Sequence, residues 1–488
     1  MNHSVLALVP ALPLLASFLL PLVPGAARRL VGPLTLLAVA FIGLNLWPLV
    51  QTEPMVLAVG DFAPPLGITF YADSVSALFV IAVALVTLVL WPWSGSDAGN
   101  LDRKQSLTLI LAGACGGLAV SGDLFNVYVF YELAAVASFG LAAGARTAAA
   151  QIATFRYVVI GSLCSLLALL GITLIYVQTG TVNLAHLAQL APLKLHNPLG
   201  LAAFFMILLG LGVKAELFLV NTWAPDVYAT AEARVSGLLA GLVSKLALLA
   251  VVRLLVLIFP LPEARDALLL LGMLGILSGE FAAFRARDVK RMLAWSSIAQ
   301  LGAAFVAFAI PGPAGLAAGL AVALHHLLVK PALFLLADRW GGSLAQITGA
   351  ARNSPVSAGL FVLFILSMLG VPPLPGFWAK YLLLSGLAAQ PEGLWWLAGA
   401  IILLTTVVEA VYLFRVIGAL YGRDHTVTPK TQSATAVIGS GVFAAVLLAV
   451  AFSAPLLALP LNRMAVQMAD SAAYIARVLP PVLPGVAP

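Results

Sequence analysis

Apolar runs of about twenty residues recur along nearly the whole chain, and this pattern restricts the fold more than any other feature. A run of that length crosses a bilayer as an α-helix, which satisfies its backbone hydrogen bonds within itself. The composition agrees, because 62% of the residues are hydrophobic and only 9% are charged. We therefore predict an all-α polytopic membrane protein. Its expected fourteen spans are residues 5–24, 29–49, 69–92, 106–122, 124–144, 153–177, 199–221, 233–259, 267–284, 292–311, 314–337, 356–385, 394–420 and 434–456.

The basic residues predict the orientation of these helices. No basic residue precedes the first run, and Arg28 and Arg29 follow it, which indicates a retained helix with its N-terminus outside. Alternating sides from there places about fifteen basic residues in the cytoplasm and four outside. We therefore predict both termini outside, in a bacterial-type inner (cell) membrane. These loop arginines account for the net charge of +6, so no nucleic-acid partner is needed.

We single out six charged residues within the predicted spans: Glu132, Lys214, Lys245, Lys330, Lys380 and Glu409. A charge at the centre of a spanning helix costs roughly 2.5 to 3.5 kcal/mol on insertion scales, so it is usually retained for a partner, an ion or a proton path. Single members of the set could have simpler origins, since Lys245 could snorkel towards a surface and Glu409 could pair with Arg415. Six such coincidences are harder to accept, which favours a shared function.

Two of the predicted helices are interrupted near a lysine. Pro225 follows Lys214, and Pro372, Pro373 and Pro375 precede Lys380. Proline removes a backbone donor, and freed backbone groups survive in a membrane only where protein or water covers them. The two breaks are five helices apart, and moving by an odd number of helices reverses direction. They therefore indicate an inverted repeat of broken helices 7 and 12, in which the lysine precedes the first break and follows the second.

A row of buried lysines and glutamates suits proton transfer. Burial favours the neutral form of either group and pairing favours the charged form, so a lysine that exchanges its carboxylate for a dry pocket releases its proton. An ion pair between Glu132 and Lys214 would act as such a switch. The remaining chemistry is sparse, because Cys115 and Cys164 lie in apolar helices without metal-ligand spacing. We expect no metal, no cofactor and no catalytic site in this chain.

Several segments of the chain resemble a known family. They are DLFNVYVFYEL, FRYVVIGSLCSLLALLGITLIYVQTGTVNL, VKAELFLVNTWAPDVY, DVKRMLAWSSIAQLG, HHLLVKPALFLLA and GVPPLPGFWAKYLLL. They are similar to the antiporter-like subunits of respiratory complex I, Mrp cation/proton antiporters and membrane-bound hydrogenases, most of all to the D-type subunit of Mrp. The resemblance implies fourteen helices with inverted five-helix repeats at helices 4–8 and 9–13. The corresponding divisions are 1–105, 106–259, 260–420 and 421–488, the last holding the final helix and the tail.

The resemblance also implies roles for individual residues. Glu132, Lys214, Lys245, His326, Lys330 and Lys380 match the family's membrane relay, and Lys290, Arg291, Ser296 and Ser297 match a motif expected to be structural. The chain departs from the family where Val322 replaces a common histidine and His325 adjoins His326. Adjacent helical residues point about 100° apart, so one histidine is expected on the relay, and His326 shares the face of Lys330. Glu409 has no clear counterpart and joins the relay on its position alone.

These observations predict a proton-translocating membrane subunit of a larger complex. Protons, alone or in exchange for sodium, would cross two half-channels joined by the lysine and histidine row. The expected partners are other membrane subunits of an antiporter, a hydrogenase or a complex I-like oxidoreductase. Two other classes stay open, because a stand-alone solute transporter also uses inverted repeats and broken helices. A membrane-embedded transferase is the third, although Asp123, Asp226 and Asp288 are better interpreted as helix-end residues.

Overall fold

A computed structural model describes residues 3–94, 98–340, 342–423 and 434–479 of the chain. Its long helices are α1 (Val5–Leu19), α2 (Arg28–Thr52), α3 (Ser74–Val89), α4 (Ala98–Val120), α5 (Leu124–Ala143), α6 (Ala148–Thr179), α8 (Pro198–Gly212), α11 (Ser244–Leu257), α12 (Pro262–Arg285), α13 (Val289–Ala309), α14 (Gly312–Ala337), α15 (Pro355–Leu369), α16 (Pro375–Ala388), α17 (Leu394–Leu420) and α18 (Ala434–Ala469). The shorter helices are α7 (Leu184–Lys194), α9 (Ala224–Thr230), α10 (Ala233–Leu238) and α19 (Ser471–Val478), with single turns η1 (Leu20–Leu22), η2 (Gly25–Ala27), η3 (Val59–Asp61) and η5 (Ala350–Arg352) and the π-helical segment η4 (Leu239–Val243).

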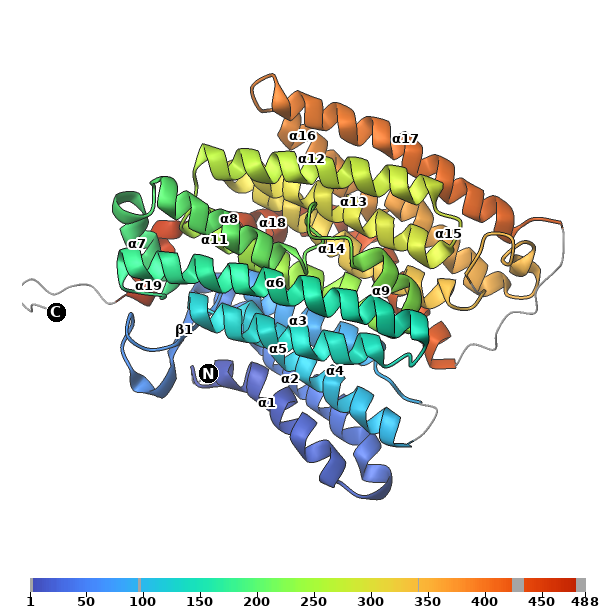
Figure 1. Ribbon diagram of the computed structural model, residues 1–488, viewed down its shortest axis with the longest axis horizontal. Helices are drawn as coiled ribbons and strands as arrows, with labels where there is room; N and C mark the ends of the chain where they lie inside the picture. Colours follow the sequence, from blue (N-terminus) through green and yellow to red (C-terminus); the bar gives the residue numbers. More distant parts are fainter. Residues whose placement is uncertain (1–2, 95–97, 341, 424–433, 480–488) are drawn as a thin grey trace, which may run out of the picture.

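Most of these helices lie lengthwise beside one another, from α1 at one edge to α17 at the other (Figure 1). Within the described residues, ten helical segments are long and apolar enough to cross a membrane, and three further apolar helices are shorter. The prediction of a mainly helical membrane protein is therefore confirmed. A small hairpin of β1 (Met55–Ala58) and β2 (Thr69–Ala72) lies at the same end of the bundle as α7 and α19 (Figure 1).

Local sequence signals explain where many helices begin and end. The side chains of Asp123, Thr147 and Asp288 accept a hydrogen bond from the first turns of α5, α6 and α13, which is the usual role of an N-cap residue. Gly180 and Gly370 end α6 and α15 in the left-handed conformation that glycine adopts without strain. The interpretation of Asp123 and Asp288 as helix-end residues is confirmed.

The first helix break begins earlier than the sequence indicated. Helix α8 ends at Gly212, so Lys214 lies inside the break rather than before it, and Pro225 starts α9 rather than interrupting a helix. Side chains take over the freed carbonyls here, because Tyr131 donates to Gly210 O at 2.7 Å and Trp223 donates to Val213 O at 2.9 Å. Such partners allow an irregular backbone at this depth.

The second break lies between Leu369, where α15 ends, and Pro375, where α16 begins. Pro372 and Pro373 occupy the connection, and Pro375 stands in the first turn of α16, where its missing N–H leaves no intrahelical bond unmade. Lys380 follows the break on α16, as predicted from the order of residues.

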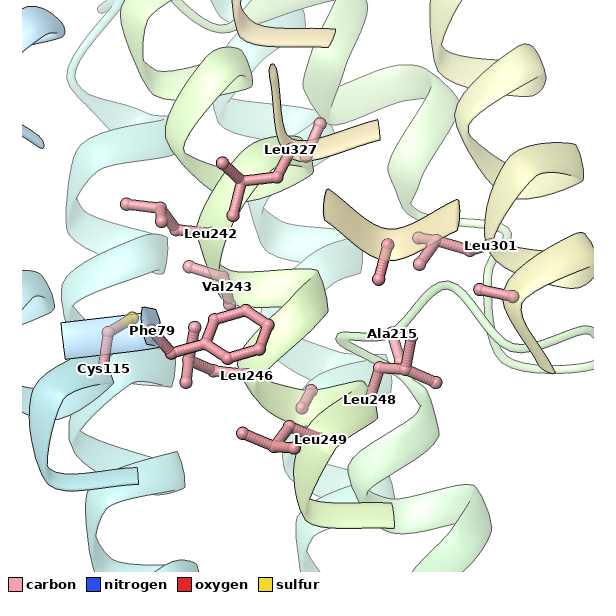
Figure 2. Packing of buried hydrophobic residues seen from close by; sticks show 14 of the residues in the cluster. Phe79, Cys115, Ala215, Leu242, Val243, Leu246, Leu248, Leu249, Leu301 and Leu327 are labelled. Atoms are coloured by element: carbon pink, nitrogen blue, oxygen red, sulfur yellow. The ribbon is translucent and has the colours of Figure 1, made fainter. Parts of the chain in front are cut away.

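The segment that carries Lys245 forms the interior of the bundle. In the continuous segment Ala233–Leu257, 94% of the most apolar stretch is buried, compared with 33% for α17. Figure 2 shows Leu242, Leu246 and Leu249 projecting from it among Phe79 of α3 and Cys115 of α4. Lys245 is therefore enclosed on all sides and does not snorkel to a surface.

Candidate functional site

Lys214 is held in an aromatic cage at the first helix break. Its ammonium donates to Tyr157 OH at 3.1 Å and lies 4.9 and 5.4 Å from the ring centres of Phe139 and Tyr131. Trp223 stacks on Tyr157 with ring centres 3.8 Å apart, which fixes the hydroxyl that receives the ammonium. A desolvated ammonium over aromatic faces gains about 2 kcal/mol per good contact, so the cage partly replaces a counter-ion.

The expected ion pair between Glu132 and Lys214 is not formed in this conformation. Glu132 on α5 is half-buried and its carboxylate accepts a hydrogen bond from Ser165 on α6. Lys214 is bonded to Tyr157 instead, and its ammonium is not within ion-pair distance of any carboxylate in the described residues.

Lys245 and His326 connect the two parts of the bundle. Lys245 on α11 contacts His326 Nδ1 on α14, and both side chains are buried. The lysine also donates to Ala240 O, a carbonyl of the π-helical segment η4, where the wider helical turn leaves backbone acceptors available. On its other side, His326 Nε2 lies 3.1 Å from Ser297 Oγ of α13.

Lys330 lies one helical turn beyond His326 and has different partners. Its ammonium donates to Ser296 Oγ at 2.8 Å and to Leu293 O at 3.1 Å, both on α13. Ser296 and Ser297 were expected to be structural, but their hydroxyls contact the lysine and the histidine of the row. The helical periodicity explains this, because two adjacent serines on α13 face two side chains one turn apart on α14.

The adjacent histidines of α14 point to different neighbours, as the 100° rotation between them predicts. His326 faces Lys245, whereas His325 Nε2 lies 2.9 Å from Ser367 Oγ on α15. His325 also lines a cavity beside Lys380. Both imidazoles thus contact polar groups of the interior, on different neighbouring helices.

Lys380 and Glu409 form a buried ion pair beside the second helix break. The Lys380 ammonium lies 2.8 Å from Glu409 Oε2, and Gln300 on α13 donates to Glu409 Oε1 at 3.0 Å. The alternative pairing of Glu409 with Arg415 is wrong, because Arg415 donates to the carbonyls of Phe284 and Ala286 at the end of α12. Lys380 also approaches Leu369 O, a carbonyl freed by the break, at 3.4 Å.

Two buried carboxylates were missed by the sequence interpretation. Glu216 is 1% exposed, adopts the left-handed backbone conformation in the first break, and accepts from Tyr228 OH at 2.6 Å. Glu280 on α12 is 3% exposed and lines the cavity of Lys380 and Glu409. One carboxylate oxygen of each has no hydrogen-bond partner in the described structure. Each is a lone acid in an apolar stretch, the same signal that singled out Glu132.

The interior thus holds a row of groups that exchange protons, together with these two carboxylates. Hydroxyl and carbonyl acceptors lie beside the row. Its members are Lys214, Lys245, His326, Lys330 and Lys380. Among the described residues, no three or more His, Cys, Asp or Glu side chains come together as a metal site would require. Cys115 and Cys164 are free and buried. The arrangement of the row is chemically suited to hold and pass protons or a small cation.

Comparison with known proteins places this geometry in context. Residues 121–408 match the family described as NADH:quinone oxidoreductase/Mrp antiporter, transmembrane. The chain is 33% identical over 388 residues to NADH-quinone oxidoreductase subunit N of Desulforudis audaxviator, covering 76% of each chain. It is 28% identical over 396 residues to the D subunit of the Na⁺/H⁺ antiporter of Bacillus subtilis, covering 78% of each.

Solved structures agree with these relatives. A chain of the membrane-bound sulfane sulfur reductase, an archaeal respiratory membrane complex, superposes with a TM-score of 0.90 at 28% identity, covering 98% of this chain and 100% of that one. A chain of the Mrp complex from a Dietzia species has the same fold, with a TM-score of 0.88 at 24% identity and the same coverage.

Proposed function

The chain belongs to the NADH:quinone oxidoreductase/Mrp antiporter transmembrane family, and from this premise we propose that it translocates protons as one membrane subunit of a larger complex. The relatives that support a complex are subunits by name, of a quinone oxidoreductase and of a sodium/proton antiporter. The observation that carries the proposal is the contact between Lys245 and His326, because it brings proton-exchanging groups of α11 and α14 together in the buried interior.

The proposed route begins at Lys214 and ends at Lys380. Glu216 lies in the first break, two residues after Lys214, and its buried carboxylate accepts a hydrogen bond from Tyr228 OH. We assign it the transfer between the aromatic cage and Lys245. His326 and Lys330 then carry the proton across α14, and Lys380 with Glu409 forms the exit at the second break.

Glu132 is the proposed switch of this route. It is half-buried and bonded to Ser165, so it is free to approach or leave Lys214 without breaking a strong ion pair. Its approach would stabilise the charged ammonium of Lys214 and its withdrawal would favour proton release. A neighbouring subunit that displaces Glu132 would in this way control the first step.

The finer architecture is also part of the proposal. We infer fourteen spans, counting the two broken helices once each, with inverted five-helix units at 106–259 and 260–420 and both termini outside. The two breaks support the inversion, because each has a lysine in it or after it and they are an odd number of spans apart: Lys214 lies inside the first break and Lys380 follows the second. Labelling of single cysteines in α1 and α19 from each side of the membrane tests the orientation.

The decisive experiment replaces Lys214 in the assembled complex. Lys214→Ala is expected to lower proton translocation at least about tenfold, as the loss of a proton-transfer group does elsewhere. Lys214→Arg should fail as well, because arginine keeps its charge but does not release its proton. Lys194→Ala, an exposed lysine at the end of α7, is the matched control. Translocation near wild type in a fully assembled Lys214→Ala complex would refute the proposal.

A further inference from the structure

The proposed route has a gap between Lys330 and Lys380. The Lys330 ammonium donates to Ser296 Oγ at 2.8 Å and to Leu293 O, whereas Lys380 is paired with Glu409 beside the second break. Within the described residues, neither lysine is bonded to a partner of the other. A proton that leaves Lys330 therefore needs at least one further group to reach Lys380.

Tyr412 on α17 is a candidate for that group. Its side chain is completely buried, and its hydroxyl lies close enough to Ser296 on α13 and Glu280 on α12 to interact with both. The hydroxyl nevertheless makes no hydrogen bond to any described residue. Buried polar groups in folded proteins are nearly always bonded, so an unbonded hydroxyl beside two possible partners indicates a group that changes its position.

Glu280 has the complementary feature. Its side chain is 3% exposed, and its Oε2 has no hydrogen-bond partner within the residues the structure describes. The neighbouring Gly279 lets α12 lie directly against α13, because a Cβ atom there would be 2.7 Å from Trp295 O. Tyr412 offers a donor and Glu280 offers an acceptor, so a small rotation of the tyrosine would satisfy both unbonded atoms at once.

Glu280 also borders a small cavity beside the second helix break. The cavity offers about 30 Å³ for water-sized groups, which is room for about two water molecules. Lys380 and Glu409 line it together with Glu280. The carboxylate of Glu280 is therefore within reach of Tyr412 and, through the cavity, of the ion pair at the end of the proposed route.

We propose that Tyr412 and Glu280 complete the route between the two lysines as further proton-transfer residues. The Lys330 ammonium gives a proton to the hydroxyl of Ser296, the proton of Ser296 passes to Tyr412, and the proton of Tyr412 passes to Oε2 of Glu280. Each hydroxyl accepts one proton and gives one, so the net change is one proton from an ammonium to a carboxylate. Glu280 then gives this proton across the cavity to Lys380, once that lysine has released its own.

The unbonded hydroxyl of Tyr412 gives this step a closed and an open state. In the described conformation the series of hydroxyls is interrupted at Tyr412, and the charges of Lys330 and Glu280 stay separate. When the tyrosine turns, the transfer neutralises both charges and leaves no uncompensated charge in the interior, where such a charge is expensive. This inference rests on the proposed function and adds to it the step between Lys330 and Lys380.

Two variants of the assembled complex test the step. Tyr412→Phe keeps the ring and removes only the hydroxyl, and Glu280→Gln keeps the shape of the side chain and removes the proton acceptor. Each should lower proton translocation about tenfold or more, as the loss of a positioned proton-transfer group does elsewhere. Tyr421→Phe at the exposed end of α17 and Glu263→Gln at the exposed start of α12 are the matched controls. Translocation near wild type in fully assembled Tyr412→Phe or Glu280→Gln would overturn the proposal.

Two further measurements separate proton transfer from packing. The hydroxyl of Tyr412 bonds to no described residue, so Tyr412→Phe should not lower the midpoint of thermal unfolding of the purified chain. The double variant of Tyr412→Phe and Glu280→Gln should translocate no more slowly than either single variant, because both groups serve one step. Losses that multiply to about a hundredfold, or a lowered midpoint in Tyr412→Phe, would indicate a packing role and contradict the proposal.

The two proposals fail separately. If Lys214→Ala abolishes translocation while Tyr412→Phe and Glu280→Gln leave it intact, the added step is wrong and the proton route stands. If these two variants lose translocation while the assembled Lys214→Ala complex works normally, the route through Lys214 is wrong.

Discussion

The ion pair between Lys380 and Glu409 is buried unevenly, and this predicts unequal costs for removing its two partners. The Lys380 side chain is 19% exposed, whereas that of Glu409 is 2% exposed. Without its carboxylate, Lys380 keeps two other acceptors, Thr406 Oγ1 and Leu369 O, each 3.4 Å from its ammonium. Without its ammonium, Glu409 retains only the amide of Gln300.

The expected losses in the free energy of unfolding follow from this difference in burial. Breaking a buried ion pair from one side typically costs 3–5 kcal/mol because the other charge is stranded, so Lys380→Met should destabilise the protein by about 3 kcal/mol. Glu409→Gln keeps an acceptor oxygen for the lysine, which also has Thr406 and Leu369 O as partners, and should cost about 1 kcal/mol, close to one ordinary hydrogen bond. The double variant should cost less than the sum, with a coupling free energy of about 1–2 kcal/mol.

The measurement is reversible unfolding of the purified chain in mixed micelles, followed by tryptophan fluorescence and circular dichroism. Lys194→Met, at an exposed position of α7, controls for the loss of a lysine in general. Equal costs for the two single variants, or strict additivity in the double variant, would refute the reasoning from burial.

Two further outcomes are expected. Gly376→Ala places a methyl group 1.7 Å from Ser367 O and 2.9 Å from His325 Nε2, so it should lower the free energy of unfolding by about 3 kcal/mol or more. Gly399→Ala is the control, because its methyl group meets no atom within 4 Å, and it should be neutral in the same unfolding assay. Burial raises the pKa of Asp123, just before α5, from 3.8 to about 6. Its contribution to stability is then fully present below pH 3.8 and is lost as the pH rises through 6, by about 3 kcal/mol. Asp123→Asn should flatten that part of the stability profile, and an unchanged profile would contradict this origin.

The membrane helices and their central charges were predictable because both leave strong local signals. Apolar runs mark the spans, and a lysine such as Lys245 in the middle of one is visible without any structure. Helix ends followed from caps such as Asp123 and Asp288. The first break was misplaced because proline was taken as its cause, whereas the helix stops at Gly212, where aromatic side chains supply the backbone partners.

The contacts within the site were less predictable, because they depend on which helices become neighbours. Glu409 pairs with Lys380 on α16 rather than with Arg415 on its own helix, and nothing local distinguishes the two choices. Glu280 stands in an apolar stretch as Glu132 does, but the sequence alone does not show which helices cover it. Only the packing of α12 against α13 and α17 shows that it is buried.

The buried charges of the interior balance in number, but most of them are not paired in direct contact, and this combination suits proton transport. The lysines of the row, Lys214, Lys245, Lys330 and Lys380, are matched in number by the glutamates Glu132, Glu216, Glu280 and Glu409. Of these lysines, only Lys380 is in direct ion-pair contact with one of these carboxylates in the described structure, and the others rely on rings, hydroxyls, carbonyls and an imidazole. A proton that moves from a lysine to a nearby glutamate neutralises both charges, so it creates no new charge in the low-dielectric interior. Fully paired lysines would instead have to break a strong contact at every step.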